Sequence, residues 1–182
     1  MALEAVPQPY PRSLINLIRA AIPSDEEQIW RLLEPVFRAG ETYTVPRDIS
    51  RADACAYWSA HGHEVFVFEE NGQVLGTYFL QANHRGGGSH VANCGYITAL
   101  HASRRGIARA MCEHSLERAR ARGFRAMQFN FVVSANERAV KLWQSLGFEI
   151  VGRLPGAFLH PTLGYVDAFV MFRELAARDF IK

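Results

Sequence analysis

Two successive units, each a strand followed by a helix, constrain the fold of this chain more than any other feature. HVANCGYITAL (90–100) and AMQFNFVV (126–133) have the composition of strands. Each is followed by apolar residues at helical spacing, over about 106–122 and, after a capping box at Ser134–Glu137, up to Gly147. Strands joined by a helical crossover run parallel in one sheet. The sequence therefore predicts a parallel pair of strands with a helix after each strand.

The remaining elements indicate antiparallel pairing around this unit. The runs at 64–70 and 73–82 flank Asn71-Gly72, the typical turn of a β-hairpin. A helix is predicted from the N-cap Ser24, with Glu27 completing a capping box, to Gly40. The other predicted elements are a strand at 13–21, a short helix at 51–60, and strands at 148–154 and 163–172.

This order of elements predicts a mixed α/β fold rather than a Rossmann repeat. We expect a mostly antiparallel sheet, a central parallel pair that splays, and helices on both faces. Three prolines interrupt the first twelve residues, so we expect an N-terminal arm at 1–12 and one domain at 13–182.

The composition makes several classes of protein improbable. With 49% hydrophobic residues among 182, the chain can bury a core, and its net charge of +2 does not demand a nucleic-acid partner. No apolar run reaches the roughly 18 residues of a membrane span. The three cysteines and seven histidines lack the spacing of metal ligands. We therefore expect no metal, no nucleic-acid or membrane partner, and free thiols in a reducing cytoplasm.

The segment GYITALHASRRGIARAM (95–111) leads a strand through a short loop into a long helix. Main-chain N–H groups at a helix start have no partner within the helix and lie at its positive end, where they bind anions. Gly106 and Ala108 keep that backbone accessible, and Arg104, Arg105 and Arg109 add positive charge. The alternative is an ordinary strand-to-helix connection whose arginines are simply solvated.

A second motif follows about 30 residues later and makes the anion site the stronger interpretation. SRRGIA (103–108) and NERAVKLWQSLGF (136–148) together resemble the two motifs of the GNAT superfamily of acetyl-CoA-dependent N-acetyltransferases. The resemblance covers roughly residues 14–175, because the order of elements also agrees. It implies the GNAT fold, acetyl-CoA as cosubstrate and acetyl transfer to an amine.

The resemblance also implies roles for individual residues. In such enzymes the loop amides hold the CoA diphosphate, the end of the preceding strand holds the pantetheine arm and polarises the thioester through its main chain, and the asparagine opening the next helix contacts the cofactor. Carried to this sequence, these cofactor-binding positions are Ile97, Thr98, Leu100, Ser103, Arg104, Arg105, Gly106, Ile107, Ala108, Arg109, Asn136 and Trp143.

Two positions depart from the family pattern. Ser103 stands where the loop motif has arginine or glutamine, which removes one side-chain contact but no amide. Trp143 stands where many relatives have a tyrosine that is proposed to protonate the leaving thiolate. A thiol has a pKa of about 8.5, so a thiolate can leave without that proton.

The acceptor side is less defined by the sequence. Glu41 is one candidate base, in a loop that lines the acceptor site of similar enzymes, with Asp167, His101 or a water chain as alternatives. Asn93 and Asn130 lie inside strands, where asparagine is disfavoured. They either bind a substrate carboxylate or satisfy main-chain groups where the strands part, and Tyr43 is a further candidate for lining the pocket.

A closer likeness favours the first alternative. The segments 129–149 and 152–172 are similar to the yeast-type N-acetyltransferases that act on azetidine-2-carboxylate and proline analogues, in which the asparagines matching Asn93 and Asn130 are implicated in substrate recognition. The predicted activity is therefore acetylation of a small amino or imino acid. The rival hypotheses are a catalytically silent CoA-binding sensor, or a protein N-acetyltransferase with an open, acidic groove. A homodimer, if formed, is expected through the edge strand at 163–172.

Overall fold

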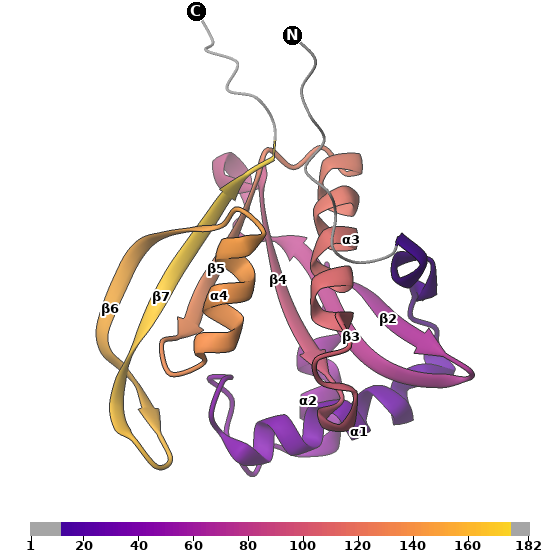
Figure 1. Cartoon of the computed structure of the whole chain (residues 1–182), viewed down its shortest axis with the longest axis horizontal. Helices are drawn as coiled ribbons and strands as arrows, with labels where there is room; N and C mark the ends of the chain where they lie inside the picture. The colour runs from indigo at the N-terminus through magenta and orange to yellow at the C-terminus, as the bar shows by residue number, and fades with distance from the viewer. Residues whose placement is uncertain (1–11, 176–182) are drawn as a thin grey trace, which may run out of the picture.

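The computed structural model describes residues 12–175, arranged around one seven-stranded sheet (Figure 1). The expected arm at 1–12 lies outside the described residues except for Arg12. The strands are β1 (Ile18–Ala20), β2 (Glu64–Glu70), β3 (Gln73–Ala82), β4 (Val91–Thr98), β5 (Ala126–Val133), β6 (Glu149–His160) and β7 (Gly164–Glu174). The α-helices are α1 (Glu26–Ala39), α2 (Arg51–Trp58), α3 (Ile107–Ala121) and α4 (Glu137–Ser145). Short 3₁₀ helices span Arg12–Leu17, Pro23–Asp25, Gly86–Gly88 and Leu100–Ala102.

The sheet has the strand order β1-β2-β3-β4-β5-β7-β6. β4 and β5 run parallel, joined by α3, and the other neighbouring strands pair antiparallel. The predicted fold class is confirmed, with the parallel pair at the centre of the sheet.

Helices cover both faces of the sheet, as two adjacent residues of β3 demonstrate. Neighbouring side chains on a strand point to opposite faces. Tyr78 hydrogen-bonds His114 of α3 (2.6 Å), whereas the ring of Phe79 packs edge-on against Trp58 of α2 (5.0 Å). One face therefore carries α3 and the other carries α2.

The N-terminal strand is shorter than predicted. Residues 12–17 form a 3₁₀ helix, and only Ile18–Ala20 pair with β2. Leu14, Leu17 and Ile18 are spaced like one side of a helical turn and pack on the core, and a short apolar run of this kind does not by itself distinguish strand from helix.

Both predicted N-caps are displaced along the chain. α1 is preceded by a 3₁₀ turn, and its N-cap is Asp25 rather than Ser24. The Asp25 carboxylate accepts a hydrogen bond from the Ile22 N–H (2.8 Å) and pairs with Arg19 (2.7 Å). α4 is capped by Asn136 rather than Ser134. In each region several residues of the preferred capping types stand close together, and tertiary contacts select among them.

The C-terminal hairpin is longer than predicted. β6 continues past the predicted end at Leu154 to His160, through Pro155 and Gly156. A register shift between Leu154 and Phe158 accommodates them. β6 is the edge strand at this end of the sheet, whereas the strand at 163–172, which was expected to be an edge, corresponds to β7 and lies between β5 and β6. A proline is tolerated in β6 because its missing N–H is not needed by a neighbour.

Candidate active site

The two central strands separate after a short ladder. β4 and β5 are paired only at Val91–Ala126 and Ala92–Met127, and β5 has an irregularity between Phe129 and Val132. Figure 1 shows the two ribbons diverging from that end. Beyond the ladder lies a cavity of about 620 Å³ bordered by residues of both strands, which we call the wedge cavity. The predicted splay is therefore present, and the gap between the strands is hollow.

The main chain of β4 has one edge turned to this gap. Asn83 N donates to Val91 O (2.8 Å) and Ala99 N donates to Leu75 O (2.8 Å), so the odd-numbered residues of β4 hydrogen-bond to β3. The main-chain groups of Tyr96 and Thr98 then face the gap. Thr98 has the orientation expected of it. Ile97 also lines the wedge cavity, but its main chain hydrogen-bonds to β3 and is turned away from the gap, contrary to the predicted main-chain contact with the cofactor.

The loop before α3 has the conformation of an anion cradle. Arg104 and Gly106 have positive φ angles of 66° and 82°, and Gly106 is the N-cap of α3. Bends of this kind turn successive N–H groups toward one point. The Ser103 N–H is used within the loop, donating to Leu100 O (3.2 Å), so the cradle begins after Ser103.

The cradle opens on a second cavity of about 390 Å³, which we call the loop cavity. Arg104, Arg109 and Arg138 line it, and within the described residues no carboxylate does. Arg105 is directed elsewhere, because its guanidinium pairs with Glu70 at the end of β2 (2.7 Å). Positive charge, small residues and a helix start fit the diphosphate of CoA.

The loop and wedge cavities adjoin, because several residues line both of them. The shared residues are Tyr96, Thr98, Asn136, Ala139 and Trp143. Together the two cavities extend from the start of α3 along β4 to the gap between the strands, which is the course an extended pantetheine arm requires. Asn136 Oδ1 accepts the Ala139 N–H (3.2 Å), so its Nδ2 hydrogens are the part able to contact a ligand.

Trp143 lines both cavities. Its indole lies 5.1 Å from the Tyr96 ring and 5.2 Å from the Phe129 ring, and its side chain is buried. The indole provides apolar surface at the position where many relatives have a tyrosine, and it has no ionisable proton to give to a leaving thiolate.

The two asparagines lie close to the last paired residues of β4 and β5, where the gap begins, and both are held by hydrogen bonds. Asn93 Nδ2 donates to Gln128 O (2.8 Å). This side-chain hydrogen bond joins β4 to β5 directly after their last main-chain pair. Asn130 donates to Asn83 Oδ1 (2.6 Å) and accepts from Gln128 Nε2 (2.8 Å). One N–H of the Asn93 amide therefore satisfies a main-chain carbonyl, which was the second of the two predicted roles. Both asparagines nevertheless line the wedge cavity.

The far side of the wedge cavity is built by the loop after α1 and by α2. Tyr43 donates from its hydroxyl to Tyr96 O (3.0 Å), tying the loop to the gap-facing edge of β4. Burial raises the pKa of Tyr43, so the hydroxyl keeps its proton. Glu41 is exposed and does not line the cavity, although its neighbours Thr42 and Tyr43 do.

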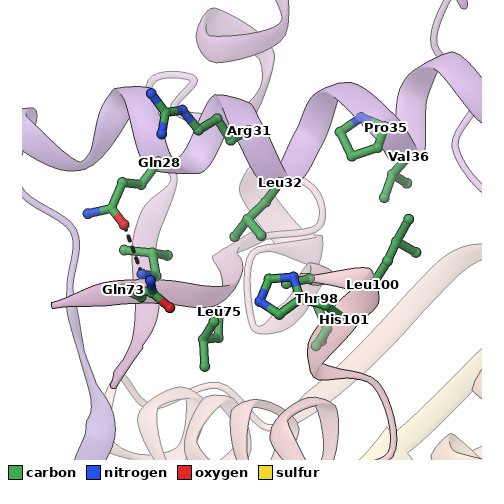
Figure 2. A pocket seen from close by; sticks show the side chains of 12 residues that line it. Gln28, Arg31, Leu32, Pro35, Val36, Gln73, Leu75, Thr98, Leu100 and His101 are labelled. Carbon is green, nitrogen blue, oxygen red and sulfur yellow. Dashed lines mark hydrogen bonds between the residues drawn. The ribbon is translucent and has the colours of Figure 1, made fainter. Parts of the chain in front are cut away.

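The other predicted bases lie outside both cavities. His101 borders a separate hollow of about 410 Å³ between α1 and the end of β4 (Figure 2). Leu100, which was predicted to bind the cofactor, borders the same hollow and lines neither the loop cavity nor the wedge cavity. Asp167 accepts from the Gly156 N–H (2.8 Å) and pairs with Arg153, and these contacts lower its pKa. Asp167 is thus kept ionised by partners in the β6–β7 hairpin.

Several residues at the site were not singled out by the sequence. Arg138 lines the loop cavity, and His63 lines the wedge cavity. A Cβ on Gly95 would lie 2.6 Å from the Phe79 ring and 3.2 Å from the Tyr43 hydroxyl. The sequence does contain a signal for Gly95, because a glycine inside a strand often marks a site where another group approaches the backbone closely.

Among residues 12–175, no group of three or more metal-ligating side chains is found, and no helix has the length and apolarity needed to cross a bilayer.

Comparison with known proteins places this site in a family context. Residues 27–148 match the model of the acetyltransferase (GNAT) family. The chain is 32% identical over 98 residues to N-acetyltransferase aca1 of Schizosaccharomyces pombe, covering 53% of this chain and 47% of that protein. The chain thus spans about half the length of the curated relative it matches.

Solved structures agree over most of the chain. A GCN5-related N-acetyltransferase from Kribbella flavida superposes with a TM-score of 0.82 at 40% identity, covering 86% of this chain and 96% of that one. The yncA structure from Salmonella typhimurium, solved with acetyl-CoA, has a TM-score of 0.78 at 22% identity, over 88% and 94% of the two chains. The second likeness is one of fold.

Proposed function

This chain belongs to the acetyltransferase (GNAT) family of acetyl-CoA-dependent acyltransferases, and on that premise we propose that it acetylates the amine of a small amino or imino acid. The observation that carries the proposal is the pair of adjoining cavities that extend from the start of α3 to the gap between β4 and β5, with the acceptor end lined by amides and aromatic rings.

In this proposal the chain acts mainly by positioning acetyl-CoA and the acceptor relative to each other. When bound, acetyl-CoA supplies an activated acetyl group, which passes to the acceptor nitrogen as the thiolate leaves. The cradle at Arg104–Ala108 holds the diphosphate, and the main chain at Tyr96 and Thr98 orients the thioester arm. Alignment of the two reactants at van der Waals distance lowers the barrier without covalent participation of the protein.

The lining of the wedge cavity supports a small, carboxylate-bearing acceptor. No aspartate, glutamate, lysine or arginine lines it within residues 12–175, and Gln81, Asn93 and Asn130 supply neutral amide groups. Next to Asn130, the Asn83 Nδ2 is buried without a hydrogen-bond partner among the described residues. A basic peptide would be expected to need acidic side chains. The neutral lining therefore supports an amino acid over a basic protein segment.

Asn130→Asp is expected to raise the acceptor KM about 10- to 100-fold, because a carboxylate then faces the substrate carboxylate and a charged hydrogen bond of about 1.5–3 kcal/mol is lost. CoA affinity should stay near normal. Steady-state kinetics with an amino acid and with its decarboxylated amine measure the effect, which should vanish for the amine. Asn83→Ala breaks the same Asn83–Asn130 bond without adding charge and should have a smaller effect. An equal rise with both acceptors would contradict a carboxylate contact.

Release of free thiol from acetyl-CoA, followed across amino acids, imino acids and peptides, tests the activity itself. Acceptor-dependent release with a small amino or imino acid supports the proposal. Tight CoA binding without release for any acceptor would instead identify a CoA sensor, and release with peptides alone would identify a protein N-acetyltransferase.

We also propose that the chain forms a homodimer in the cytoplasm. Cys55, Cys94 and Cys112 are free thiols, which suits a reducing compartment. Leu159, Leu163 and Tyr165, at the end of the β6–β7 hairpin, are 64%, 61% and 78% exposed. Exposed apolar side chains at a sheet edge suit a second copy of the same chain in an isologous contact.

The double variant Leu159→Glu with Tyr165→Glu should convert this dimer to a monomer, because a charge on each copy would enter the shared contact. Sedimentation equilibrium should give twice 20.5 kDa for the wild-type chain and 20.5 kDa for the variant. A wild-type chain that sediments as a monomer at all concentrations would rule the contact out.

A further inference from the structure

We propose that His63 is the base that takes the proton from the acceptor ammonium. The inference rests on the proposed function and deepens it, since an amine must lose a proton before or as it attacks a thioester. His63 precedes β2, comes from the loop after α2, and lines the wedge cavity.

One ring nitrogen of His63 is fixed as a donor. His63 Nδ1 lies 2.9 Å from the main-chain oxygen of Trp58, and a carbonyl oxygen can only accept. Nδ1 therefore carries hydrogen, and in the neutral ring Nε2 keeps its lone pair. The anchor is rigid, because Trp58 is fully buried and its indole N–H donates to Thr77 Oγ1 (3.0 Å).

The plane of the imidazole is also fixed. The ring stacks on Phe79 with centroids 4.3 Å apart and an interplanar angle of 13°. Phe79 is in turn held against Trp58 and lies opposite Gly95 of β4, where a side chain is missing. The same set of rings that walls the acceptor side of the cavity thus orients the imidazole.

The other titratable groups lining the cavity are poor proton acceptors. Tyr43, Tyr57 and Tyr96 would have to be ionised to accept, and burial raises the pKa of each. Burial likewise raises the pKa of the Cys94 thiol.

The charged or titratable groups beside His63 in sequence are directed away from the cavity lining. Glu64 pairs with Arg118 (2.7 Å) and Arg122 (2.8 Å). His61 is exposed and does not line the cavity. His63 is therefore the one imidazole lining the wedge cavity among residues 12–175.

The step balances without another reactant. The acceptor R–NH₃⁺ gives one proton to His63 Nε2, directly or through a water, and becomes R–NH₂. The nitrogen lone pair forms the new carbon–nitrogen bond as the carbon–sulfur bond breaks, and the thiolate takes the electron pair of the carbon–sulfur bond. The second nitrogen proton passes to the thiolate or to solvent, which leaves a neutral amide and CoA. The imidazolium returns its proton to solvent through the mouth of the cavity.

The test is His63→Gln, in which an amide can still donate toward the Trp58 carbonyl, beside His61→Gln as the matched exposed control. With an amino acid acceptor at neutral pH, kcat/KM should fall about 100-fold or more for His63→Gln, the usual contribution of a general base. His61→Gln and Glu41→Gln should resemble the wild-type chain.

An aminooxy acid separates proton removal from positioning, because its nitrogen is already uncharged at neutral pH. His63→Gln should acetylate it at nearly the wild-type rate, whereas an equal loss with both acceptors would overturn the base role in favour of a structural one. Full amino acid turnover by His63→Gln would overturn it as well. Absence of thiol release by the wild-type chain is a different result, which defeats the proposed function.

Nitrogen-15 NMR of the wild-type chain with CoA gives a readout independent of any acceptor. In the neutral ring, hydrogen on Nδ1 and an unprotonated Nε2 are expected. Hydrogen on Nε2 would overturn the inference, because that nitrogen could then accept nothing.

Discussion

Gly106→Glu is expected to abolish CoA binding, with affinity falling at least about 100-fold while the chain remains folded. The new carboxylate would lie at the N-cap of α3, where the lining offers arginines and main-chain donors to a diphosphate. A like charge in a desolvated anion site costs several kcal/mol, and each 1.4 kcal/mol is tenfold in affinity. Isothermal titration with CoA measures the change.

Two other variants separate charge from backbone strain in this experiment. Gly106 has a φ of 82°, so any side chain there adds strain. Gly106→Gln has the same shape and strain as Gly106→Glu but no charge, and Gly106→Ala adds the least bulk. The glutamine variant should retain more CoA affinity than the glutamate variant. If all three bind CoA like the wild-type chain, the diphosphate is held elsewhere.

Local signals were sufficient for much of the architecture. The Asn71-Gly72 hairpin, the helix beginning after Gly106 and the crossover from β4 to β5 each depend on a few adjacent residues, and the structure has all of them. The parallel pair follows from the crossover, and the cradle follows from the helix start. The predicted cofactor side of the site depends on these local features alone.

The acceptor side could not be predicted in the same way, because it depends on contacts between distant segments. The orientation of His63 comes from Trp58 and from Phe79, and nothing in its own neighbourhood signals a cavity. Asn93 was recognised as unusual in a strand, but its bond to Gln128 O depends on where two strands stop pairing. Serine and aspartate are both preferred N-cap residues, so residue type alone does not distinguish Ser24 from Asp25 as the N-cap of α1. In the structure the N-cap is Asp25, whose carboxylate also pairs with Arg19.

Gly95→Ala should impair acceptor turnover severely while leaving CoA affinity close to normal. The added Cβ would lie 2.6 Å and 2.9 Å from two atoms of the Phe79 ring, closer than carbon atoms can approach. Phe79 is 4% exposed and held between Trp58 and His63, so it cannot move alone. Displacing this stack by about 1 Å should lower acceptor kcat/KM on the order of 100-fold.

The same variant should be measurably less stable. Overpacking a core costs about 1–3 kcal/mol, which lowers Tm by several degrees in a chain of this size. Gly76→Ala is the matched control, since its Cβ would meet the flexible end of Met111 at 2.9 Å and Ile107 at 3.0 Å on the α3 face. Its Tm should fall similarly, but any kinetic effect should be on CoA, because Ile107 begins α3. Normal acceptor kinetics in Gly95→Ala, despite the lowered Tm, would mean that the acceptor does not bind against the Phe79 stack.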